Sequence, residues 1–174
     1  MNTFLPLPDY KASAEVLDDK RLGKQRVECL QLVNTLLGKS TGWKNHPCTR
    51  MWQGRVNALI EYGLEICYEW VRRGFKDTVS EQLYALFDQN DNRQPYWLGS
   101  YKLHYSHQCN LLRKDLKHYG QYWPNLEISM PYFWPSNIYD WRYSESDFGT
   151  IWEEGSFTIY PKLGFNGNSN VGQS

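Results

Sequence analysis

The feature that most constrains the fold is a stripe of apolar residues at helical spacing between Cys48 and Arg73. Apolar side chains recur every three or four residues there, which places them on one face of a helix. The members of the stripe are Trp52, Val56, Leu59, Ile60, Gly63, Ile66, Cys67, Trp70 and Val71. The segment therefore predicts a core helix that ends at Gly74, because glycine commonly follows the C-terminus of a helix.

A second long helix is predicted earlier in the chain. The prolines of residues 4–8 favour an extended segment, and a helix is expected to begin between Tyr10 and Ser13 and to reach Leu37. At about 100° per residue, one side of this helix carries Val16, Leu22, Gly23, Val27, Leu30, Val33 and Leu37. Gly23 on that side predicts the close approach of another helix.

The other side of the first helix is polar, with Asp18, Arg21, Gln25 and Glu28. We expect Glu28 either to face solvent or to lie in a cleft. Arg26 falls with the apolar set, where a buried guanidinium needs a carboxylate or several carbonyl groups as partners. It therefore either anchors a site or forms a structural pair.

The remaining helices are predicted to be shorter. Thr78 and Ser80 could cap a short helix that ends near Asp88. A further helix is expected from about Ser100 to Lys117.

The pattern changes after Pro124, where prolines and glycines separate short aromatic segments. Residues 150–152 and 156–160 could pair as one small hairpin, and residues 164–174 are typical of a flexible tail. We predict a mainly α fold, a single helical bundle over residues 1–163 with an irregular aromatic C-terminal section.

The charges balance overall, with 19 Lys and Arg against 19 Asp and Glu, so no net field points to a nucleic acid. Basic residues are in excess over residues 1–124 and acidic ones over residues 125–174. This division weakly favours a polyanionic partner for the basic part, and chance unevenness on a solvated surface is the alternative. The 8 Trp and 13 Tyr serve either as core or as surfaces on which bases stack.

The four cysteines include no CxxC pair, and Cys29 and Cys67 fall in apolar helical patterns, where we expect them to be buried. The N-terminus does not follow the secretory pattern, and no apolar run approaches the roughly 20 residues of a membrane span. We expect a cytoplasmic protein with reduced thiols and no membrane partner.

Residues 17–28 gather cations around one glutamate, Glu28; the cations are Lys20, Arg21, Lys24 and Arg26. An amine or cation beside a carboxylate near a chain end is suited to attack and protonation at a glycosidic carbon. His46, in a loop just before Pro47, is either a general base or a helix cap.

Two histidines, His104 and His107, share a helix face at i, i+3. No convincing third ligand stands nearby, so we expect no metal and no cofactor. The sequence contains no glycine-rich phosphate loop, HExxH or GxSxG motif, which excludes the usual kinases, zinc proteases and serine hydrolases.

Cations and aromatic residues alternate over residues 110–123, as at a helix end that faces nucleic acid. The alternative is an amphipathic helix with a solvated charged face. We expect one basic surface around the end of the first helix, formed by Arg21, Lys24, Lys44, Arg113 and Lys114.

Three blocks stand in order in the first half of the chain. They are Leu17-Asp18-x-Lys20-x-Leu22 with Glu28, then Gly42-Trp43-Lys44-Asn45-His46-Pro47, then Glu69-x-x-x-Arg73-Gly74-Phe75. Together these blocks resemble the endonuclease V-type pyrimidine dimer DNA glycosylases, over about residues 1–78.

The resemblance implies a small helical protein that flips a nucleotide out of duplex DNA and acts on damaged or modified pyrimidines. It implies that an N-terminal α-amine attacks C1′ to form an imine, and that Glu28 assists departure of the base and a later AP-lyase step. An arginine, here Arg26, would hold the substrate. Because Asn2 is large, Met1 is expected to be retained, so the nucleophile is its amine, Lys20 or Lys24.

The expected catalytic residues are thus Glu28, Met1, Lys24, Arg26 and His46. The expected DNA contacts are Lys20, Arg21, Lys44, Asn45, His107, Arg113, Lys114 and Tyr119. Two alternatives remain open: a non-catalytic DNA- or nucleotide-binding protein on the same fold, and an enzyme that cleaves N-glycosidic bonds of free nucleotides.

Overall fold

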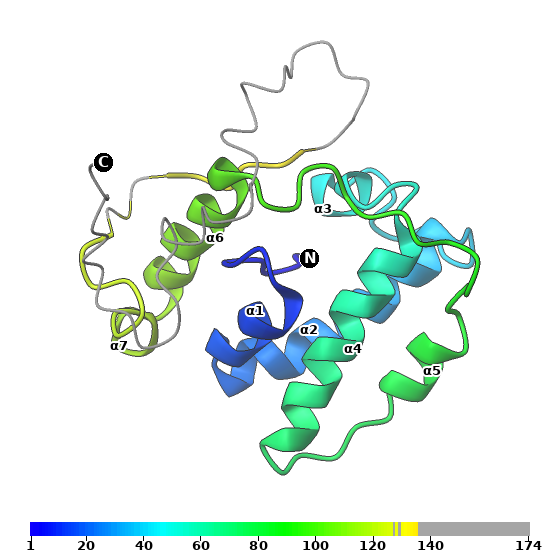
Figure 1. Ribbon diagram of the computed structural model, residues 1–174, viewed down its shortest axis with the longest axis horizontal. Coiled ribbons are helices and arrows are strands. Elements are labelled where there is room, and N and C mark those ends of the chain that lie inside the picture. The colour runs from blue at the N-terminus through cyan, green and yellow to red at the C-terminus, as the bar shows by residue number, and fades with distance from the viewer. Residues whose placement is uncertain (127, 129, 136–174) are drawn as a thin grey trace, which may run out of the picture.

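The computed structural model describes residues 1–126, 128 and 130–135. Within these residues all regular secondary structure is helical, in seven segments from α1 to α7 (Figure 1). The prediction of a mainly α fold is confirmed. The hairpin predicted within residues 150–160 and the tail and domain boundary predicted near residue 164 lie outside the described residues.

Two long helices, α2 (Asp19–Leu36) and α4 (Val56–Arg72), pack against each other at the centre of the fold (Figure 1). A Cβ atom on Gly23 would lie 2.9 Å from the ring of Trp70, and one on Gly63 would lie 2.4 Å from Sγ of Cys29. Larger residues at these two positions would push the helices apart. The close approach predicted from Gly23 is therefore confirmed.

The N-terminal residues 1–8 form no helix and run through the middle of the molecule, between α6 (Tyr101–Lys114) and the α2–α4 pair (Figure 1). Buried backbone outside a helix needs partners for its N–H and C=O groups. The ring of His107 accepts a 3.1 Å hydrogen bond at Nδ1 from the N–H of Leu5. The ring of His104 accepts at Nε2 from the N–H of Gly99, so its Nδ1 donates to the Leu5 carbonyl at 2.8 Å. These two histidines hold the N-terminal segment in place.

The single helix predicted over residues 10–37 is wrong, because the chain forms α1 (Tyr10–Val16) and α2 as separate helices. Asp18 stands between them in an extended conformation and accepts a 3.1 Å hydrogen bond from the N–H of Arg21. Aspartate is among the preferred N-cap residues, so the local capping signal overrides the apolar periodicity that runs across it.

Arg73, at the end of α4, stabilises this break from the other side. Its guanidinium donates to the carbonyl oxygens of Leu17 at 2.7 Å and Glu15 at 3.1 Å, which the end of α1 leaves without helical partners. It also pairs with Asp19 at 2.8 Å and with the buried carboxylate of Glu69 at 2.7 Å. The Glu69–Arg73 block therefore joins three helices.

The helix predicted over residues 48–73 also divides, into α3 (Pro47–Met51) and α4. Gly54, between them, has φ of 72°, a conformation that glycine adopts readily and that ends a helix. His46 caps α3, since its Nδ1 accepts a 3.1 Å hydrogen bond from the N–H of Cys48. Capping was one of the two roles predicted for this histidine.

The two later helices also differ from their predicted bounds. The first, α5 (Ser80–Tyr84), is shorter than predicted. The helix predicted over residues 100–117 divides at Asp115 into α6 and α7 (Leu116–Tyr119). The Asp115 side chain accepts a 3.0 Å hydrogen bond from the N–H of His118 and so begins a new helix.

The prediction of which side of α2 is buried is wrong in part. Val27 and Leu37, from the predicted apolar side, are 45% and 42% exposed, whereas Gln25 and Glu28 are buried. The reason is the N-terminal segment, which lies against the polar side of α2. This helix is therefore covered on two sides, by α4 and by residues 1–4.

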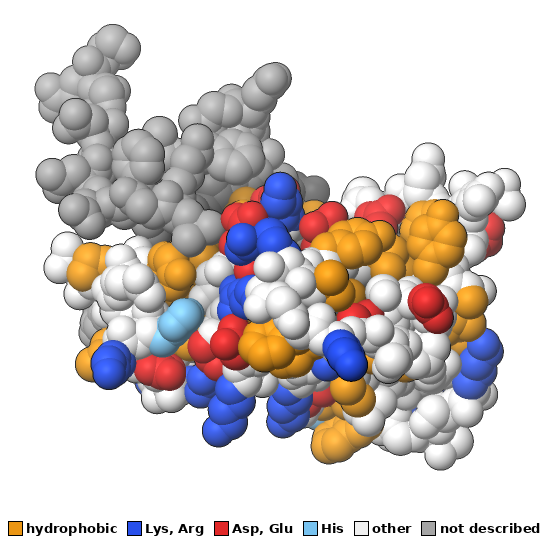
Figure 2. Space-filling view, turned by 90° about the horizontal axis from the view of Figure 1, so that it is seen from below, with side chains coloured by type: hydrophobic (Ala, Val, Ile, Leu, Met, Phe, Trp, Pro, Cys, Tyr) orange, Lys and Arg blue, Asp and Glu red, His pale blue; other side chains and the backbone are white. Residues whose placement is uncertain are grey.

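All four cysteines, Cys29, Cys48, Cys67 and Cys109, are free and buried, as predicted for Cys29 and Cys67. On the described part of the face drawn in Figure 2, lysine and arginine side chains lie among aspartates, glutamates and apolar residues. Among the described helices, none is both long and apolar enough to cross a membrane.

Candidate active site

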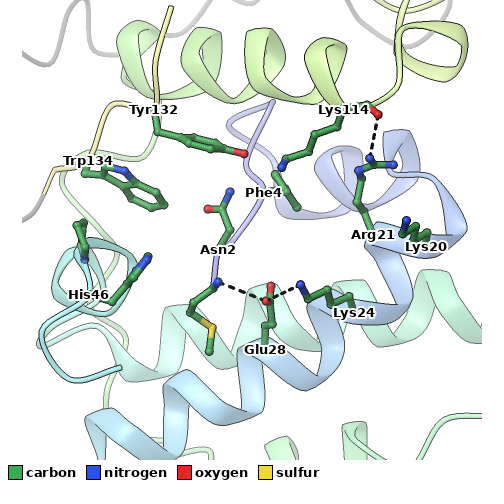
Figure 3. Close-up of a pocket in the computed structure, with 12 residues that line it drawn as sticks. Asn2, Phe4, Lys20, Arg21, Lys24, Glu28, His46, Lys114, Tyr132 and Trp134 are labelled. Carbon is green, nitrogen blue, oxygen red and sulfur yellow. Dashed lines mark hydrogen bonds and ion pairs between the residues drawn. The ribbon is translucent and has the colours of Figure 1, made fainter. Parts of the chain in front are cut away.

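A pocket of about 550 Å³ lies between the N-terminal residues, α2, the start of α3, the end of α6 and the segment around residue 133 (Figure 3). Its described lining residues are Met1, Asn2, Phe4, Lys20, Arg21, Lys24, Glu28, His46, Pro47, Lys114, Tyr132 and Trp134. The volume falls within the range typical of ligand pockets. Because the lining comes from distant parts of the sequence, the pocket forms only when the chain folds.

Glu28 projects into this pocket from α2, between Met1 and Lys24, and is only 8% exposed (Figure 3). Its Oε1 is 3.6 Å from the α-amine nitrogen of Met1 and 3.5 Å from Nζ of Lys24. Its Oε2 accepts a 2.9 Å hydrogen bond from Nε2 of Gln25. The carboxylate is thus fully paired, as a buried charge must be.

Gln25, which was not predicted as a site residue, positions both the carboxylate and the N-terminal segment. Its Nε2 donates to the carbonyl of Asn2 at 3.0 Å as well as to Glu28. Its Oε1 accepts from the N–H of Phe4 at 2.9 Å and from the hydroxyl of Tyr62 at 2.7 Å. In the sequence, Gln25 stands out only as a long polar residue one helical turn before Glu28. Its hydrogen-bond partners depend on the path of the N-terminal segment, which the sequence pattern does not show.

One side of the pocket is cationic and is formed by Lys20, Arg21, Lys24 and Lys114 (Figure 3). The Arg21 guanidinium is fixed, since it donates to Asp18 at 2.7 Å and to the carbonyl of Lys114 at 3.2 Å. Although burial acts to raise it, the pKa of Asp18 is lowered by hydrogen bonds from Tyr119 and Arg21. The cationic side brings together three of the five residues expected on one basic surface.

The opposite side of the pocket is aromatic and is formed by His46, Tyr132 and Trp134 (Figure 3). Trp134 packs edge to face on His46, with ring centroids 5.9 Å apart, and lies 5.4 Å from Tyr132. Tyr132 and Trp134 were not predicted as site residues, although the sequence shows the run of aromatic residues between Pro131 and Pro135. Nothing local in that run indicates which pocket it closes.

The arrangement is suited to a substrate with an anionic part and a flat part. The described lining residues include four cationic side chains and an α-amine, but one carboxylate. An amine beside a carboxylate can exchange a proton with it and can act as a nucleophile once unprotonated. Among the described residues, no three His, Cys, Asp or Glu side chains are grouped as metal ligands.

Residues 1–83 match the family model of pyrimidine dimer DNA glycosylases. This glycosylase match includes the three blocks that carried the sequence resemblance, and it supports a pyrimidine dimer DNA glycosylase type of function in general. It covers Met1, Lys24, Glu28 and His46 of the pocket but ends before Lys114 and the aromatic segment. The search of curated proteins and the search of solved structures gave no match.

The hydrogen bonding of His46 differs from what a catalytic base requires. Burial lowers the pKa of its ring, and the nearby α-amine of Met1 adds to this effect, so the ring is neutral near pH 7. Its Nδ1 lone pair is occupied by the N–H of Cys48, so the proton of the neutral ring is on Nε2. In this state His46 can donate a hydrogen bond but has no free lone pair with which to accept a proton.

Arg26, one of the expected catalytic residues, lies away from the pocket. Its guanidinium forms an ion pair with the buried side chain of Asp77 and lies 4.5 Å from the ring centroid of Trp70. It does not line the pocket, because it sits on the side of α2 that faces α4. Of its two predicted roles, the structural pair is the one observed.

His107 and Tyr119, both expected to contact DNA, are fully buried in this structure. His107 holds the N-terminal segment at Leu5. The Tyr119 hydroxyl donates a 2.6 Å hydrogen bond to Asp18, beside the start of α2. Neither residue lines the pocket, but each holds a segment that carries pocket residues.

Three other expected DNA contacts lie outside the pocket lining. Lys44 and Asn45 are exposed in the loop before α3. Arg113 is exposed at the end of α6, where it donates to the carbonyl of Met130 at 3.1 Å and to Asn110. It thereby fixes the start of the aromatic segment.

Proposed function

We propose that this protein is a DNA glycosylase that removes damaged or modified pyrimidines through attack of the Met1 amine at C1′, assisted by Glu28. The observation that carries this proposal is the 3.6 Å distance between the amine nitrogen and Glu28 Oε1 inside the pocket. The match of residues 1–83 to pyrimidine dimer DNA glycosylases supports the general type of reaction.

In the proposed chemistry Glu28 takes the proton that keeps the amine from acting as a nucleophile, directly or through one water. The amine nitrogen then bonds to C1′ as the bond from C1′ to the base breaks. The electron pair of that bond leaves with the base, which takes up a proton. The nitrogen, now bonded to C1′, gives up a proton, and its lone pair forms the C=N bond of a protonated imine. The bond from C1′ to the ring oxygen breaks in the same step, and that oxygen takes up a proton.

The imine permits a second step, the AP-lyase reaction. A base, here Glu28, removes a proton from C2′, and the electron pair of that C–H bond forms a double bond as the 3′-phosphate leaves. One carboxylate thus serves both steps, because it returns to its ionised form after each proton transfer.

The two sides of the pocket suit the two parts of a nucleotide. Lys24 and Lys114, on the cationic side, would bind the phosphates that flank the target. Trp134 and Tyr132, on the aromatic side, would stack on a base that has left the duplex. Base flipping is required because C1′ of a stacked nucleotide cannot reach a buried amine.

The test is cleavage of the N-glycosidic bond in a duplex oligonucleotide that contains one pyrimidine dimer, measured as a strand break at the lesion after treatment with alkali. Glu28→Gln keeps the size of the side chain and removes its charge, and it should lower the rate by roughly 10²–10⁴-fold, as for a lost general acid or base. Glu81→Gln, an exposed position on α5, is the matched control and should leave the rate unchanged.

The outcomes also separate the alternatives. Salt-dependent duplex binding without glycosidic cleavage indicates a DNA-binding protein that lacks catalysis. Cleavage of that bond in free nucleotides but not in duplex DNA indicates an N-glycosidic-bond enzyme of another substrate class. A Glu28→Gln variant with the wild-type rate contradicts the role assigned to the carboxylate.

A further inference from the structure

Trp43 combines two properties that rarely occur together. Its side chain is 53% exposed, and its backbone has φ of 63°, the one positive value at a non-glycine position among the described residues. A bulky side chain is strongly disfavoured in this left-handed region. An exposed aromatic ring on such a backbone contributes little to the core that would compensate for the strain.

The backbone around Trp43 is held from two helices. Thr35 of α2 donates to the carbonyl of Gly42 at 2.8 Å. The carbonyl of Trp43 accepts from the N–H of His46 at 2.9 Å and from the hydroxyl of Thr49, on α3, at 2.7 Å. Strained backbone persists where its surroundings fix it in this way, and such positions cluster at functional sites. The loop therefore holds the exposed ring of Trp43 in a fixed position.

The ring stands beside the pocket. Trp43 packs edge to face on His46 with centroids 5.6 Å apart, and His46 in turn lines the pocket and contacts Trp134. Lys44 and Asn45, next in the chain, are exposed and can contact phosphates. The surroundings thus fit a DNA backbone that crosses the rim of the pocket.

We infer that Trp43 is a wedge that inserts into the DNA duplex and fills the space vacated when a nucleotide enters the pocket. This inference rests on the proposed function, because it requires a flipped nucleotide. Extrusion of a nucleotide leaves a gap in the base stack, and apolar side chains are able to fill such gaps. A rigid ring beside the pocket entrance is placed to do so without first being ordered.

Trp43→Gly is the informative variant, because glycine removes the ring and also suits the positive φ, so the fold should be retained or stabilised. Cleavage of the N-glycosidic bond at one pyrimidine dimer in duplex DNA should slow by about tenfold to a hundredfold, the range expected when one base–aromatic stack is lost. Cleavage of the same strand without its complement should change little, since there is no duplex gap to fill. Trp43→Phe should keep most of the duplex rate.

A binding measurement tests the inference independently of catalysis. A 2-aminopurine placed beside the lesion reports unstacking as a rise in fluorescence. Wild-type protein should produce this rise on the duplex, and Trp43→Gly should reduce it. Tyr68→Ala, an equally exposed aromatic position on α4, is the control and should behave as wild type.

The results separate this inference from the proposed function. If the fluorescence rise depends on Trp43 but the glycosidic bond is not cleaved, the wedge is supported and the proposed chemistry fails. If the bond is cleaved and Trp43→Gly lowers the rate equally on single-stranded and duplex DNA, or on neither, the wedge is wrong. A wild-type protein that leaves duplex fluorescence unchanged also overturns it.

Discussion

The side-chain amide of Gln25 donates a 2.9 Å hydrogen bond to Glu28, and the same nitrogen donates a 3.0 Å bond to the carbonyl of Asn2. One nitrogen therefore fixes both the carboxylate and the chain segment that carries the amine. The 3.6 Å separation of the Met1 amine from Glu28 is a consequence of this shared donor. The chemistry of the pocket thus depends on a residue that is itself buried beneath it.

Replacing Gln25 should separate the two halves of the site. Gln25→Ala leaves the N–H of Phe4, the carbonyl of Asn2 and the hydroxyl of Tyr62 without this partner. We expect a loss of about 2–4 kcal/mol in the free energy of unfolding, from several buried polar groups left unpaired. Urea unfolding measures it. Gln82→Ala, exposed on α5, should change stability by less than about 0.5 kcal/mol, and equal effects of the two variants would contradict the role of Gln25.

The cationic side of the pocket should determine how strongly binding depends on salt. Lys114→Ala removes one candidate phosphate contact and should reduce the slope of log K against log salt concentration by about 0.9. Duplex binding measured over a range of salt concentrations gives this slope. Lys11→Ala, on the exposed part of α1, should leave it unchanged. A Lys114→Ala variant with the wild-type slope would remove Lys114 from the DNA-binding surface.

Buried histidines should make the fold sensitive to acid. Burial lowers the pKa of His104 to about 4 and that of His107 to about 3, below the value of about 6.5 in an unfolded chain. The unfolded state therefore binds more protons as the pH falls below 6.5. The contribution of these histidines to the free energy of unfolding should be constant above pH 6.5. Below that pH it should fall by about 1.4 kcal/mol per pH unit for each histidine, towards pH 4.5.

His107→Asn tests this dependence, because an asparagine oxygen can take the place of Nδ1 and accept from the N–H of Leu5. The variant should be less stable at pH 7, since it loses ring packing, but its stability should fall less steeply with pH. Unfolding curves at several pH values between 7 and 4.5 measure both effects. An unchanged slope would mean that His107 does not titrate with unfolding.

The contact between α2 and α4 should tolerate no added atoms at Gly63. A Cβ there would lie 2.4 Å from Sγ of Cys29 and 2.7 Å from Cδ1 of Leu83. Gly63→Ala should therefore destabilise the protein by about 1–3 kcal/mol, the usual cost of overpacking. Thermal or urea unfolding tests it. Gly42→Ala, where the nearest atom is 3.6 Å away, should have little effect, and a similar loss at both positions would point to a cause other than packing.

The sequence predicts the helical class because the apolar stripes of α2 and α4 are long and regular. The sequence predicts helix boundaries less well where a capping residue falls inside a continuous apolar repeat. At Asp18 the N-cap starts a new helix although the apolar repeat continues across it. That interruption was readable, since aspartate before a run of helix formers is a start signal. Gly54 and Asp115 are further examples of the same kind.

The site could be predicted only where its residues are close in sequence. Glu28, Lys24 and Lys20 stand within a few helical turns, so their grouping follows from helical geometry. Gln25, Tyr132 and Trp134 enter the site through the path of the N-terminal segment and of residues 130–135, which no periodicity encodes. The buried roles of His107 and Arg26 likewise depend on which helix packs against them.

The most direct test of the central claim is to trap the imine. Wild-type protein is incubated with duplex DNA that contains one pyrimidine dimer in the presence of borohydride, which reduces an imine to a stable amine. The intact mass of the protein establishes its first residue, and peptide mapping locates the DNA adduct. We expect an adduct on the α-amine of Met1, greatly reduced in Glu28→Gln. Glycosidic cleavage without any adduct, or an adduct on the side chain of Lys20 or Lys24, would contradict attack by the Met1 amine.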